Sequence, residues 1–322
     1  MADGWLEALY DLAGKRVWVA GHGGLVGSAM VRRLQREDVE VLSVPRATLD
    51  LREEAPTQEW IAGNRPDVIV MAVAKVGGIL ANRDYPDEFY NDNVAIQNNV
   101  IHAAAQFGVE KLLFLGSSCI YPKDAAQPIT EDALMSGALE PTNEAYARAK
   151  IEGIKLCQAY RAQGHDFITA MPCNLYGPGD RFDLERSHVL PALMMKAHAA
   201  KQAGADSLSV WGSGMPRREF LHADDLADAL LFLLRRYSGQ KPVNIGAGRD
   251  ISIAELAHKV CAAVGFKGRL VFDASKPDGV MRKLMDSSRI YNAGWRPEIL
   301  LEDGLKTTYG WYREYHGYKS AA

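Results

Sequence analysis

Arg16-Val-Trp-Val-Ala-Gly-His-Gly-Gly-Leu-Val-Gly27 is the stretch of sequence that decides the fold. Its apolar beginning predicts a buried strand, its glycines follow with the spacing G-x-x-G-x-x-G, and a helical pattern through Met30, Val31 and Leu34 comes next. A glycine turn between a strand and a helix lets the backbone approach a diphosphate, and the start of the helix offers free N–H groups. The stretch therefore predicts a dinucleotide site, with candidate contacts at Gly21, His22, Gly23, Gly24, Leu25, Val26 and Gly27.

Strand and helix patterns alternate after this turn. Expected strands at 39–44, 68–73, 112–116 and 167–171 are separated by expected helices at 53–64, 86–106 and 143–163. This alternation predicts an α/β fold, namely a Rossmann-type doubly wound parallel sheet with helices on both faces. The pattern becomes less regular from residue 179, although we expect helices at 224–237 and 301–315 and one that Ser187 opens as its cap.

The expected domain division follows from this change in pattern. Residues 15–175 should form the dinucleotide-binding Rossmann domain, to which a later segment at about 210–245 returns. Residues 176–209 and 246–322 should form a smaller C-terminal α/β substrate-binding domain, and residues 1–14 an N-terminal extension.

Composition excludes several classes of function. The 322 residues carry a net charge of −3, so neither nucleic acid nor an anionic membrane surface is an expected partner. No apolar run is long enough to span a bilayer, and the acidic N-terminus lacks the basic start of a signal peptide. The four cysteines form no CxxC pair, which argues against a metal site and suits a reducing cytoplasm.

The end of the second expected strand bears on the choice of cofactor. A fold that prefers NAD usually places an acidic residue there, whereas this chain reads Ser43-Val-Pro-Arg46 and has no acid before Asp50. Arg46 could instead meet the 2′-phosphate of NADP(H), although a solvated loop arginine is the plainer interpretation.

Tyr146 and Lys150 are four residues apart and share one face of an expected helix. A phenol has an unperturbed pKa of about 10, and a nearby ammonium group lowers that pKa by stabilising the phenolate. The pair can therefore exchange a proton with a substrate while the hydroxyl of Ser117 orients a carbonyl group. A surface tyrosine and lysine on an ordinary helix is the alternative, and it would prevail if the pair stood alone.

Further candidates lie where expected strands end. If the chain stays extended after residue 116, Ser117 and Cys119 point to the same side and face the site of Tyr146, although a free cysteine is more often a small buried hydrophobe. The paired arginines at 217 and 218 lie in a turn-rich stretch and suit a diphosphate. The remaining candidate cofactor contacts are Leu115, Gly116, Ser117, Ser118, Lys150, Pro172, Cys173, Asn174, Leu175 and His188.

Several longer blocks resemble one known family. These blocks are Ala74-Lys-Val-Gly-Gly-Ile79, Gly116-Ser-Ser-Cys-Ile-Tyr-Pro-Lys123, Pro141-Thr-Asn-Glu144, Asn174-Leu-Tyr-Gly-Pro178, Ser187-His-Val-Leu-Pro-Ala192, Trp211-Gly-Ser-Gly214 and Phe272-Asp-Ala-Ser-Lys-Pro-Asp-Gly279. With the glycine turn and the Tyr-x-x-x-Lys pair, they resemble the GDP-L-fucose synthase family of extended short-chain dehydrogenase/reductases. The resemblance runs from about residue 15 to the C-terminal helix.

The resemblance implies a two-step reaction on GDP-4-keto-6-deoxy-D-mannose. In the family a cysteine and a histidine, matched here by Cys119 and His188, move the protons on C3 and C5 so that both centres are inverted. NADPH then reduces C4, with the proton from Tyr146, the C4 oxygen held by Ser117, and Lys150 on the ribose. The resemblance also implies a homodimer, for which the helices 86–106 and 143–163 are candidate interfaces, and substrate contacts at Lys196, Trp211, Arg218 and Asp278.

Two departures from the family pattern affect these expectations. Gly23 stands where the family often has an arginine that grips the 2′-phosphate, and Lys196 replaces what is often an arginine. His188 also falls at an expected helix start, where the helix dipole disfavours imidazolium. The rival interpretations are a sugar-nucleotide 4-reductase or 4-epimerase that leaves C3 and C5 untouched, an enzyme for a related GDP-sugar, and a non-catalytic dinucleotide-sensing protein.

Overall fold

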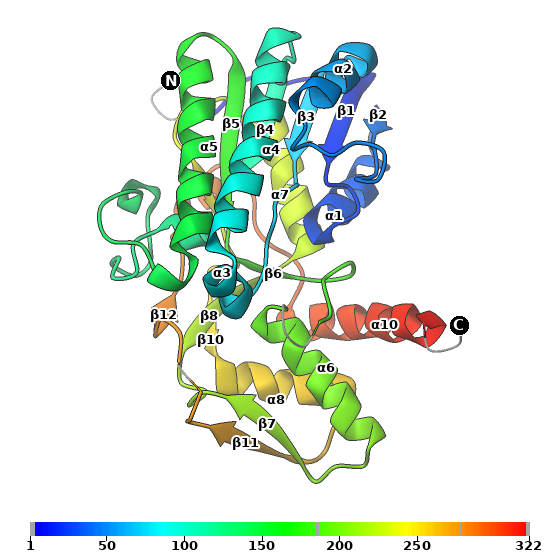
Figure 1. Cartoon of the computed structure of the whole chain (residues 1–322), viewed down its shortest axis with the longest axis vertical. Helices are drawn as coiled ribbons and strands as arrows, with labels where there is room; N and C mark the ends of the chain where they lie inside the picture. Colours follow the sequence, from blue (N-terminus) through cyan, green and yellow to red (C-terminus); the bar gives the residue numbers. More distant parts are fainter. Residues whose placement is uncertain (1–3, 184–186, 277, 320–322) are drawn as a thin grey trace.

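The computed structural model describes residues 4–183, 187–276 and 278–319. Parts of the expected N-terminal extension (1–3) and of the expected substrate domain (184–186, 277 and 320–322) lie outside the described residues. The described chain forms two packed units, one above the other in Figure 1.

A six-stranded parallel sheet forms the centre of the first unit, which confirms the expected fold class. Its strands, in spatial order, are β2 (Val39–Leu42), β1 (Lys15–Ala20), β3 (Val68–Met71), β4 (Lys111–Leu115), β5 (Asp166–Pro172) and β9 (Val243–Ile245). All residues of β3 and β4 are buried, as is typical of parallel strands that are covered on both faces. The order reverses direction between β1 and β3, and ligands of such sheets bind beyond the carboxyl ends of strands at that point.

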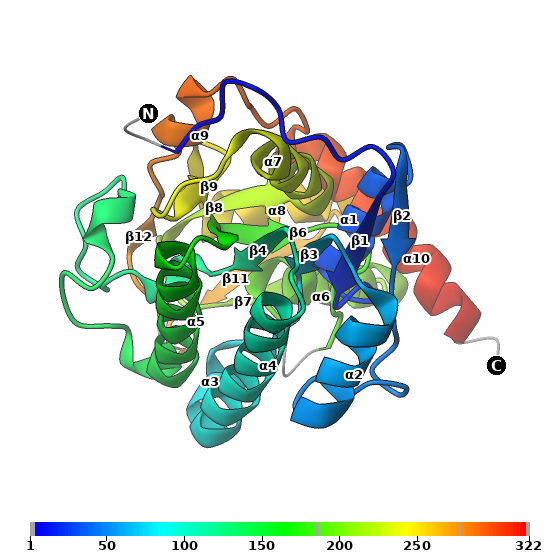
Figure 2. The same cartoon turned by 90° about the horizontal axis from the view of Figure 1, so that it is seen from above.

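Helices cover both faces of this sheet. Figure 2 shows α2 (Glu54–Asn64), α4 (Pro86–Gln106) and α5 (Glu144–Ala162) on one face, and α7 (Ala223–Arg236) on the other. The helix α1 (Leu25–Leu34) packs against α7, and two short helices, α3 (Ile79–Asp84) and α9 (Ser288–Asn292), complete the unit.

The second unit is built from smaller sheets. One sheet has the order β10 (Asp250–Ser252), β8 (Arg217–His222) and β12 (Arg282–Lys283), with β6 (Asn174–Tyr176) also pairing with β8. The other sheet pairs β7 (Ser207–Trp211) with β11 (Arg269–Asp273). The helices α6 (Val189–Gln202), α8 (Ile253–Val264) and α10 (Leu301–Lys319) pack with these strands around a second core.

The chain crosses between the two units several times. It leaves the first unit after β5, returns as α7 and β9, leaves again at β10, returns after β12 with Met285 and α9, and leaves finally for α10. Within the segment 210–245, β7 and β8 pair with strands of the second unit, and side chains from Leu221 onwards belong to the first core. The stretch expected to be turn-rich ends where β8 begins, at Arg217.

The N-terminal extension is packed from residue 4 onwards. The backbone N–H groups of Leu6 and Tyr10 donate to the carbonyls of Arg236 and Arg235 at 2.7 and 2.8 Å. Leu12 is buried in the first core. No helix in the described part of the chain combines the length and apolar character that crossing a membrane requires.

Candidate active site

The glycine turn after β1 has the geometry that the sequence predicts. Gly21 has a φ of +88°, and the N–H of Gly24 donates to its carbonyl at 3.0 Å. A Cβ atom at Gly27 would lie 2.0 Å from that carbonyl oxygen, so only glycine lets α1 begin this close to the turn. Gly24 is the N-cap of α1 without a side-chain cap, and the first turn has no acidic residue. The N–H groups at this helix start are therefore free for a phosphate.

Other observations at the turn fit a dinucleotide. Nδ1 of His22 is buried without a partner in the described structure, and Gly23 and Gly24 are exposed. Arg46 lies beyond the end of β2 with its side chain 74% exposed and 3.6 Å from Asp50. This exposed guanidinium is free to turn towards a ligand. Arg52 holds Asp50 more tightly and lowers the pKa of that carboxyl group to about 2.

Ser117, Tyr146 and Lys150 come together where β4 ends. Lys150, one helical turn after Tyr146 on α5, is buried and donates from Nζ to the carbonyl of Leu115 at 2.9 Å. Its ammonium lies 4.7 Å from the centre of the Phe114 ring. Tyr146 is partly exposed and forms a hydrogen bond with Ser117. The helix α5 thus brings the phenol of Tyr146 and the ammonium of Lys150 to the end of β4, where Ser117 supplies a hydroxyl group.

Burial is the largest cause of the pKa shifts of Tyr146 and Lys150. Burial raises the pKa of Tyr146, the nearby Cys119 sulfur raises it further, and the hydrogen bond with Ser117 opposes both effects. Burial also lowers the pKa of Lys150 from 10.5 to about 8. Without ligands the phenol is therefore protonated and the ammonium is held in an environment that disfavours its charge.

The expectation that the chain stays extended after β4 is wrong. Residues Ser118–Ile120 form a 3₁₀ turn, because the hydroxyl oxygen of Ser117 accepts the N–H of Cys119 at 3.3 Å and caps that turn. Cys119 still faces the site, since its sulfur interacts electrostatically with Tyr146 and with Arg218 from β8. Cys119 is partly exposed, whereas Cys157, Cys173 and Cys261 are buried.

His188, not Ser187, is the N-cap of α6. Ser187 cannot cap the helix because its hydroxyl donates to the carbonyl of Arg181 at 2.6 Å and accepts the N–H of Asp183 at 2.7 Å. The side chain of His188 remains open to solvent, yet the surrounding protein atoms lower the pKa of its imidazole by desolvation. The ring is therefore neutral at pH 7, in the direction expected at a helix start.

The start of α5 also differs from the expected capped helix. Pro141–Asn143 form a 3₁₀ turn first, in which the side chain of Glu140 accepts the N–H of Thr142 at 3.4 Å. Asn143 is the N-cap of α5 but makes no side-chain cap bond.

The candidate substrate contacts lie in the second unit, in two pairs. The ammonium of Lys196 is 4.7 Å from the ring centre of Trp211, which is 51% exposed, and both line a hollow of about 430 Å³ between α6 and β7. Asp278 accepts the backbone N–H of Ser213 at 2.9 Å and interacts electrostatically with Arg218. Arg218 makes no ion pair within the described residues, so its charge is available to an anion.

The segment from Pro172 to Leu175 connects the two units. The N–H of Cys173 donates to the carbonyl of Ile245 in β9, and the side chain of Asn174 donates to the backbone carbonyl of Glu219 in β8 at 2.9 Å. The segment therefore runs from the carboxyl end of β5 to the strand that carries Arg218.

Two residues near the site were missed by the sequence analysis. Nζ of Lys283 lies 3.4 Å from the carbonyl oxygen of Ser118, and β12 is in register with β8 so that Lys283 pairs with Arg218. Glu219 is fully buried in β8 between residues of both units. Lys283 stands beside Arg282 in the sequence, and this basic pair was the available signal, whereas nothing local in the sequence distinguishes Glu219.

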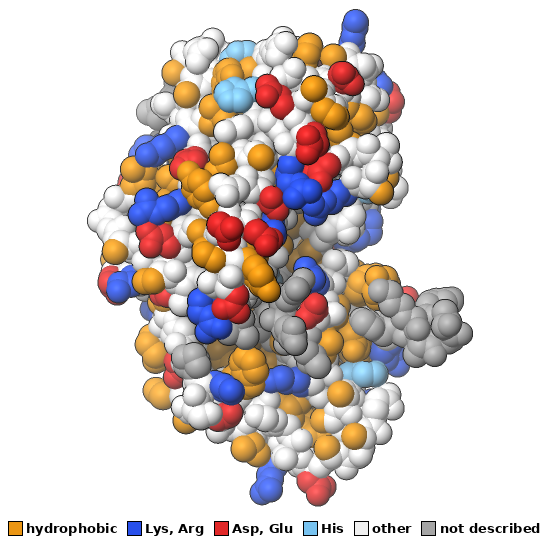
Figure 3. Space-filling model, in the orientation of Figure 1, with side chains coloured by type: hydrophobic (Ala, Val, Ile, Leu, Met, Phe, Trp, Pro, Cys, Tyr) orange, Lys and Arg blue, Asp and Glu red, His pale blue; other side chains and the backbone are white. Residues whose placement is uncertain are grey.

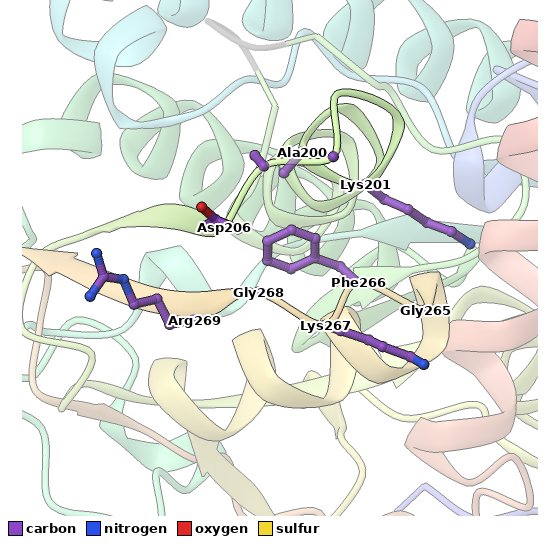
Figure 4. Close-up of a pocket in the computed structure, with 10 residues that line it drawn as sticks. Ala200, Lys201, Asp206, Gly265, Phe266, Lys267, Gly268 and Arg269 are labelled. Atoms are coloured by element: carbon purple, nitrogen blue, oxygen red, sulfur yellow. The ribbon is translucent and has the colours of Figure 1, made fainter.

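A second hollow has no link to these residues. It has a volume of about 630 Å³ and is lined by the end of α6, the loop that precedes β7, the loop between α8 and β11, and the first residue of β11, with Lys201, Phe266 and Arg269 among the labelled side chains of Figure 4. None of the candidate residues lines it. Within residues 4–183, 187–276 and 278–319, no cluster of three histidine, cysteine or acidic side chains could hold a metal ion.

Comparison with known proteins shows the family to which this chain belongs. Residues 17–246 match the NAD dependent epimerase/dehydratase family. The GDP-L-fucose synthase of Sinorhizobium fredii is 58% identical over 94% of this chain and 96% of its own length, and that of Escherichia coli is 50% identical over 93% and 97%. The chain belongs to the GDP-L-fucose synthases of this epimerase/dehydratase family.

A solved GDP-L-fucose synthetase has the same fold. The structure of the Naegleria fowleri protein bound to NADP superposes with a TM-score of 0.89 at 29% identity, covering 97% of this chain and 98% of that one. The family resemblance in the sequence is thus confirmed over nearly the whole chain.

Proposed function

We propose that this protein is an NADPH-dependent GDP-L-fucose synthase that converts GDP-4-keto-6-deoxy-D-mannose by 3,5-epimerisation and 4-reduction. The observation that carries the proposal is the grouping of Ser117, Tyr146 and Cys119 at the carboxyl end of β4, with Arg218 of the second unit interacting with Cys119. A reductase needs the first two groups, whereas the thiol has a task only if carbon centres are also epimerised.

The first unit would hold the cofactor. The free N–H groups at the start of α1, the glycines of the turn and the exposed Arg46 fit the diphosphate and the 2′-phosphate of NADP(H). The Pro172–Leu175 segment and Lys150 would border the nicotinamide ribose. NADPH, when bound, supplies the hydride for C4.

The second unit would hold the GDP portion of the substrate. Trp211 offers an exposed aromatic surface beside Lys196, and Arg218 offers a forked guanidinium for the diphosphate. Asp278 lies within the electrostatic reach of Arg218 and fixes the turn at Ser213. This arrangement directs the sugar towards the end of β4.

Cys119 and His188 would carry out the epimerisation. The C4 ketone acidifies the protons on C3 and C5, so that one group removes a proton and the other returns one to the opposite side of the sugar. His188 is neutral in the free protein because desolvation lowers its pKa. The negative charges of a bound GDP-sugar would favour its imidazolium form, so His188 would acquire its proton as the substrate binds.

Tyr146 and Ser117 would complete the reduction. Tyr146 remains protonated because burial raises its pKa, and its phenol can give that proton to the C4 oxygen as the ketone becomes an alcohol. Ser117 orients the same oxygen, and the positive charge of Lys150 stabilises the phenolate that remains.

One experiment tests both steps. The protein is incubated with GDP-4-keto-6-deoxy-D-mannose and NADPH in deuterated water, and the product is analysed by NMR. The expected product is GDP-L-fucose with deuterium at C3 and C5. Deuterium at neither position would leave a plain 4-reductase or 4-epimerase, and no oxidation of NADPH would favour a dinucleotide-sensing protein.

Cys119→Ser separates the two steps further. The variant should lose deuterium exchange more strongly than it loses reduction of an already epimerised ketone, because only the exchange needs the thiol. Equal loss of both activities would contradict the role of Cys119.

We further propose a cytoplasmic homodimer. All four cysteines are free, which suits a reducing compartment, and the α4 and α5 helices that pack together on one face are the proposed interface. Light scattering after size-exclusion chromatography should give twice the 35.4 kDa mass of one chain. A single-chain mass would contradict the dimer.

A further inference from the structure

Glu219 is a buried acid that the proposed chemistry does not use. It lies in β8 next to Arg218 and has no exposed surface. No lysine, arginine or histidine of the described residues forms an ion pair with it. A buried carboxyl group without a cation is unfavourable unless hydrogen bonds compensate for the lost hydration, so its presence calls for a role.

The partners of Glu219 are backbone N–H groups at two of the places where the chain crosses between the units. Oε1 accepts from Gly248 at 2.8 Å, and Oε2 accepts from Met285 at 3.2 Å. Ala247 also donates to the carboxylate. Residues 246–248 connect β9 of the cofactor unit to β10, and Met285 leads from β12 back into the first core.

The backbone of Glu219 reaches a third crossing. Its carbonyl accepts the side-chain amide of Asn174, which lies in the segment proposed to border the nicotinamide. One residue therefore joins the strand of Arg218, the proposed diphosphate contact, to three connections with the cofactor unit.

We propose that Glu219, as a carboxylate, is a positioning residue that fixes the distance between the cofactor and the nucleotide sugar. This inference rests on the proposed function, since it concerns the relative placement of the two ligands of that reaction. A carboxylate only accepts hydrogen bonds, and all its partners here are donors. Protonation would place an O–H group against an N–H group and loosen one of the crossings.

The surroundings of Glu219 bring the pKa of its carboxyl group close to neutral pH. Burial raises the pKa of its carboxyl group to about 7, and Asp250, which pairs with it from β10, contributes in the same direction. Cys173 after β5 and Tyr291 of α9 also face it, and both are neutral at pH 7 because burial raises their pKa values. The carboxylate therefore forms as the pH rises through about 7.

The consequences for rate and stability have opposite signs. Because the pKa of Glu219 is higher in the folded than in the unfolded chain, the stability it contributes is complete at low pH and is lost as the pH rises through about 7. The positioning of the two ligands, in contrast, should improve as the pH rises over the same range, because more of Glu219 is then a carboxylate. Glu219→Gln should therefore remain folded at pH 8 while its ligands are poorly aligned.

The test measures the reductive step alone, with the full-length protein, NADPH and an already epimerised GDP-keto-sugar. We expect Glu219→Gln to lower kcat on the order of 10- to 100-fold, since small misplacements of reacting groups have effects of this size. The separate dissociation constants for NADP⁺ and GDP should stay within about twofold of wild type. The inflection of kcat/KM near pH 7 in the wild type should disappear.

Two further variants serve as controls for this test. Gly246→Ala places a Cβ atom 2.3 Å from Oε1 of Glu219 and should displace the carboxylate without removing it, so kcat should fall while the pH 7 inflection remains. Glu131→Gln is the matched control, because Glu131 is a buried acid that accepts a backbone N–H from Asn244 within the first unit alone. Its rate should be close to that of wild type.

The outcomes separate the inference from the proposed function. A wild-type protein that reduces no keto-sugar refutes the proposed function. An active wild type whose Glu219→Gln variant keeps its kcat or its pH profile refutes the positioning role. Loss of both ligand affinities, or an equal loss in Glu131→Gln, also refutes it, because either result shows a general effect of removing a buried acid.

Discussion

Lys150→Met should make the protein more stable while it impairs reduction. Burial lowers the pKa of Lys150 from 10.5 to about 8, which corresponds to roughly 3 kcal/mol against the charged form at about 1.4 kcal/mol for each tenfold change in acidity. The substitution keeps a side chain of similar length but loses the hydrogen bond to the carbonyl of Leu115, a loss of about 1 kcal/mol. The free energy of unfolding without ligands should therefore rise by roughly 2 kcal/mol at pH 7.

The dependence of this gain on pH has a definite sign. Between pH 8 and 10.5 the unfolded wild-type chain binds more protons than the folded one, so the free energy of unfolding of the wild type rises with pH in this window. The advantage of Lys150→Met should thus shrink at pH 9.5. The reduction rate should fall by about 10²- to 10⁴-fold, because the variant lacks the charge that stabilises the Tyr146 phenolate.

Urea denaturation at pH 7 and pH 9.5 measures both effects. Lys155→Met is the matched control, since Lys155 is exposed on the same helix and its replacement should change stability by less than about 0.5 kcal/mol. A Lys150→Met variant less stable than wild type at pH 7, or one whose advantage is equal at both pH values, would refute the reasoning.

Three further substitutions test the ligand sites. Gly27→Ala should abolish NADPH binding in a fluorescence titration, because the new Cβ atom would lie 2.0 Å from the carbonyl oxygen of Gly21; unchanged affinity would contradict the proposed diphosphate site. Gly23→Arg should increase the preference for NADPH over NADH by about tenfold, since no atom lies within 4 Å of the added Cβ and a guanidinium binds phosphate strongly. Equal affinities for both cofactors would speak against a 2′-phosphate beside the turn. Trp211→Ala should raise KM for the GDP-sugar by about tenfold with little change in kcat, because stacking of one base contributes about 1–3 kcal/mol; a lower kcat alone would exclude a binding role.

The parts of the fold that the sequence predicts well depend on local chemistry. The turn at Gly21 follows from glycine spacing, and the expected helix 86–106 coincides with α4, which has Pro86 in its first turn. Tyr146 and Lys150 lie on the same side of α5 because they are one helical turn apart. These features require no knowledge of distant partners.

The parts of the fold that the sequence does not predict depend on competing side-chain hydrogen bonds or on partners that are distant in the sequence. The turn at Cys119 arises because the hydroxyl of Ser117 competes with the extended chain for a backbone N–H. Similarly, Ser187 is occupied by the carbonyl of Arg181 and leaves the cap position to His188. The strand β8 exists through pairing with β6, β10 and β12, which the local pattern around Arg217 does not reveal.

The interleaved path of the chain limits how such an enzyme can change its substrate. Each unit is assembled from separate stretches of sequence, so neither can be obtained by cutting the gene at one point. Replacing the second unit by that of a relative would need several recombination junctions at once, and every inserted segment would have to fit the core of the first unit. New sugar specificities on this scaffold should therefore arise by single substitutions of residues that face the sugar, and seldom by recombination of segments.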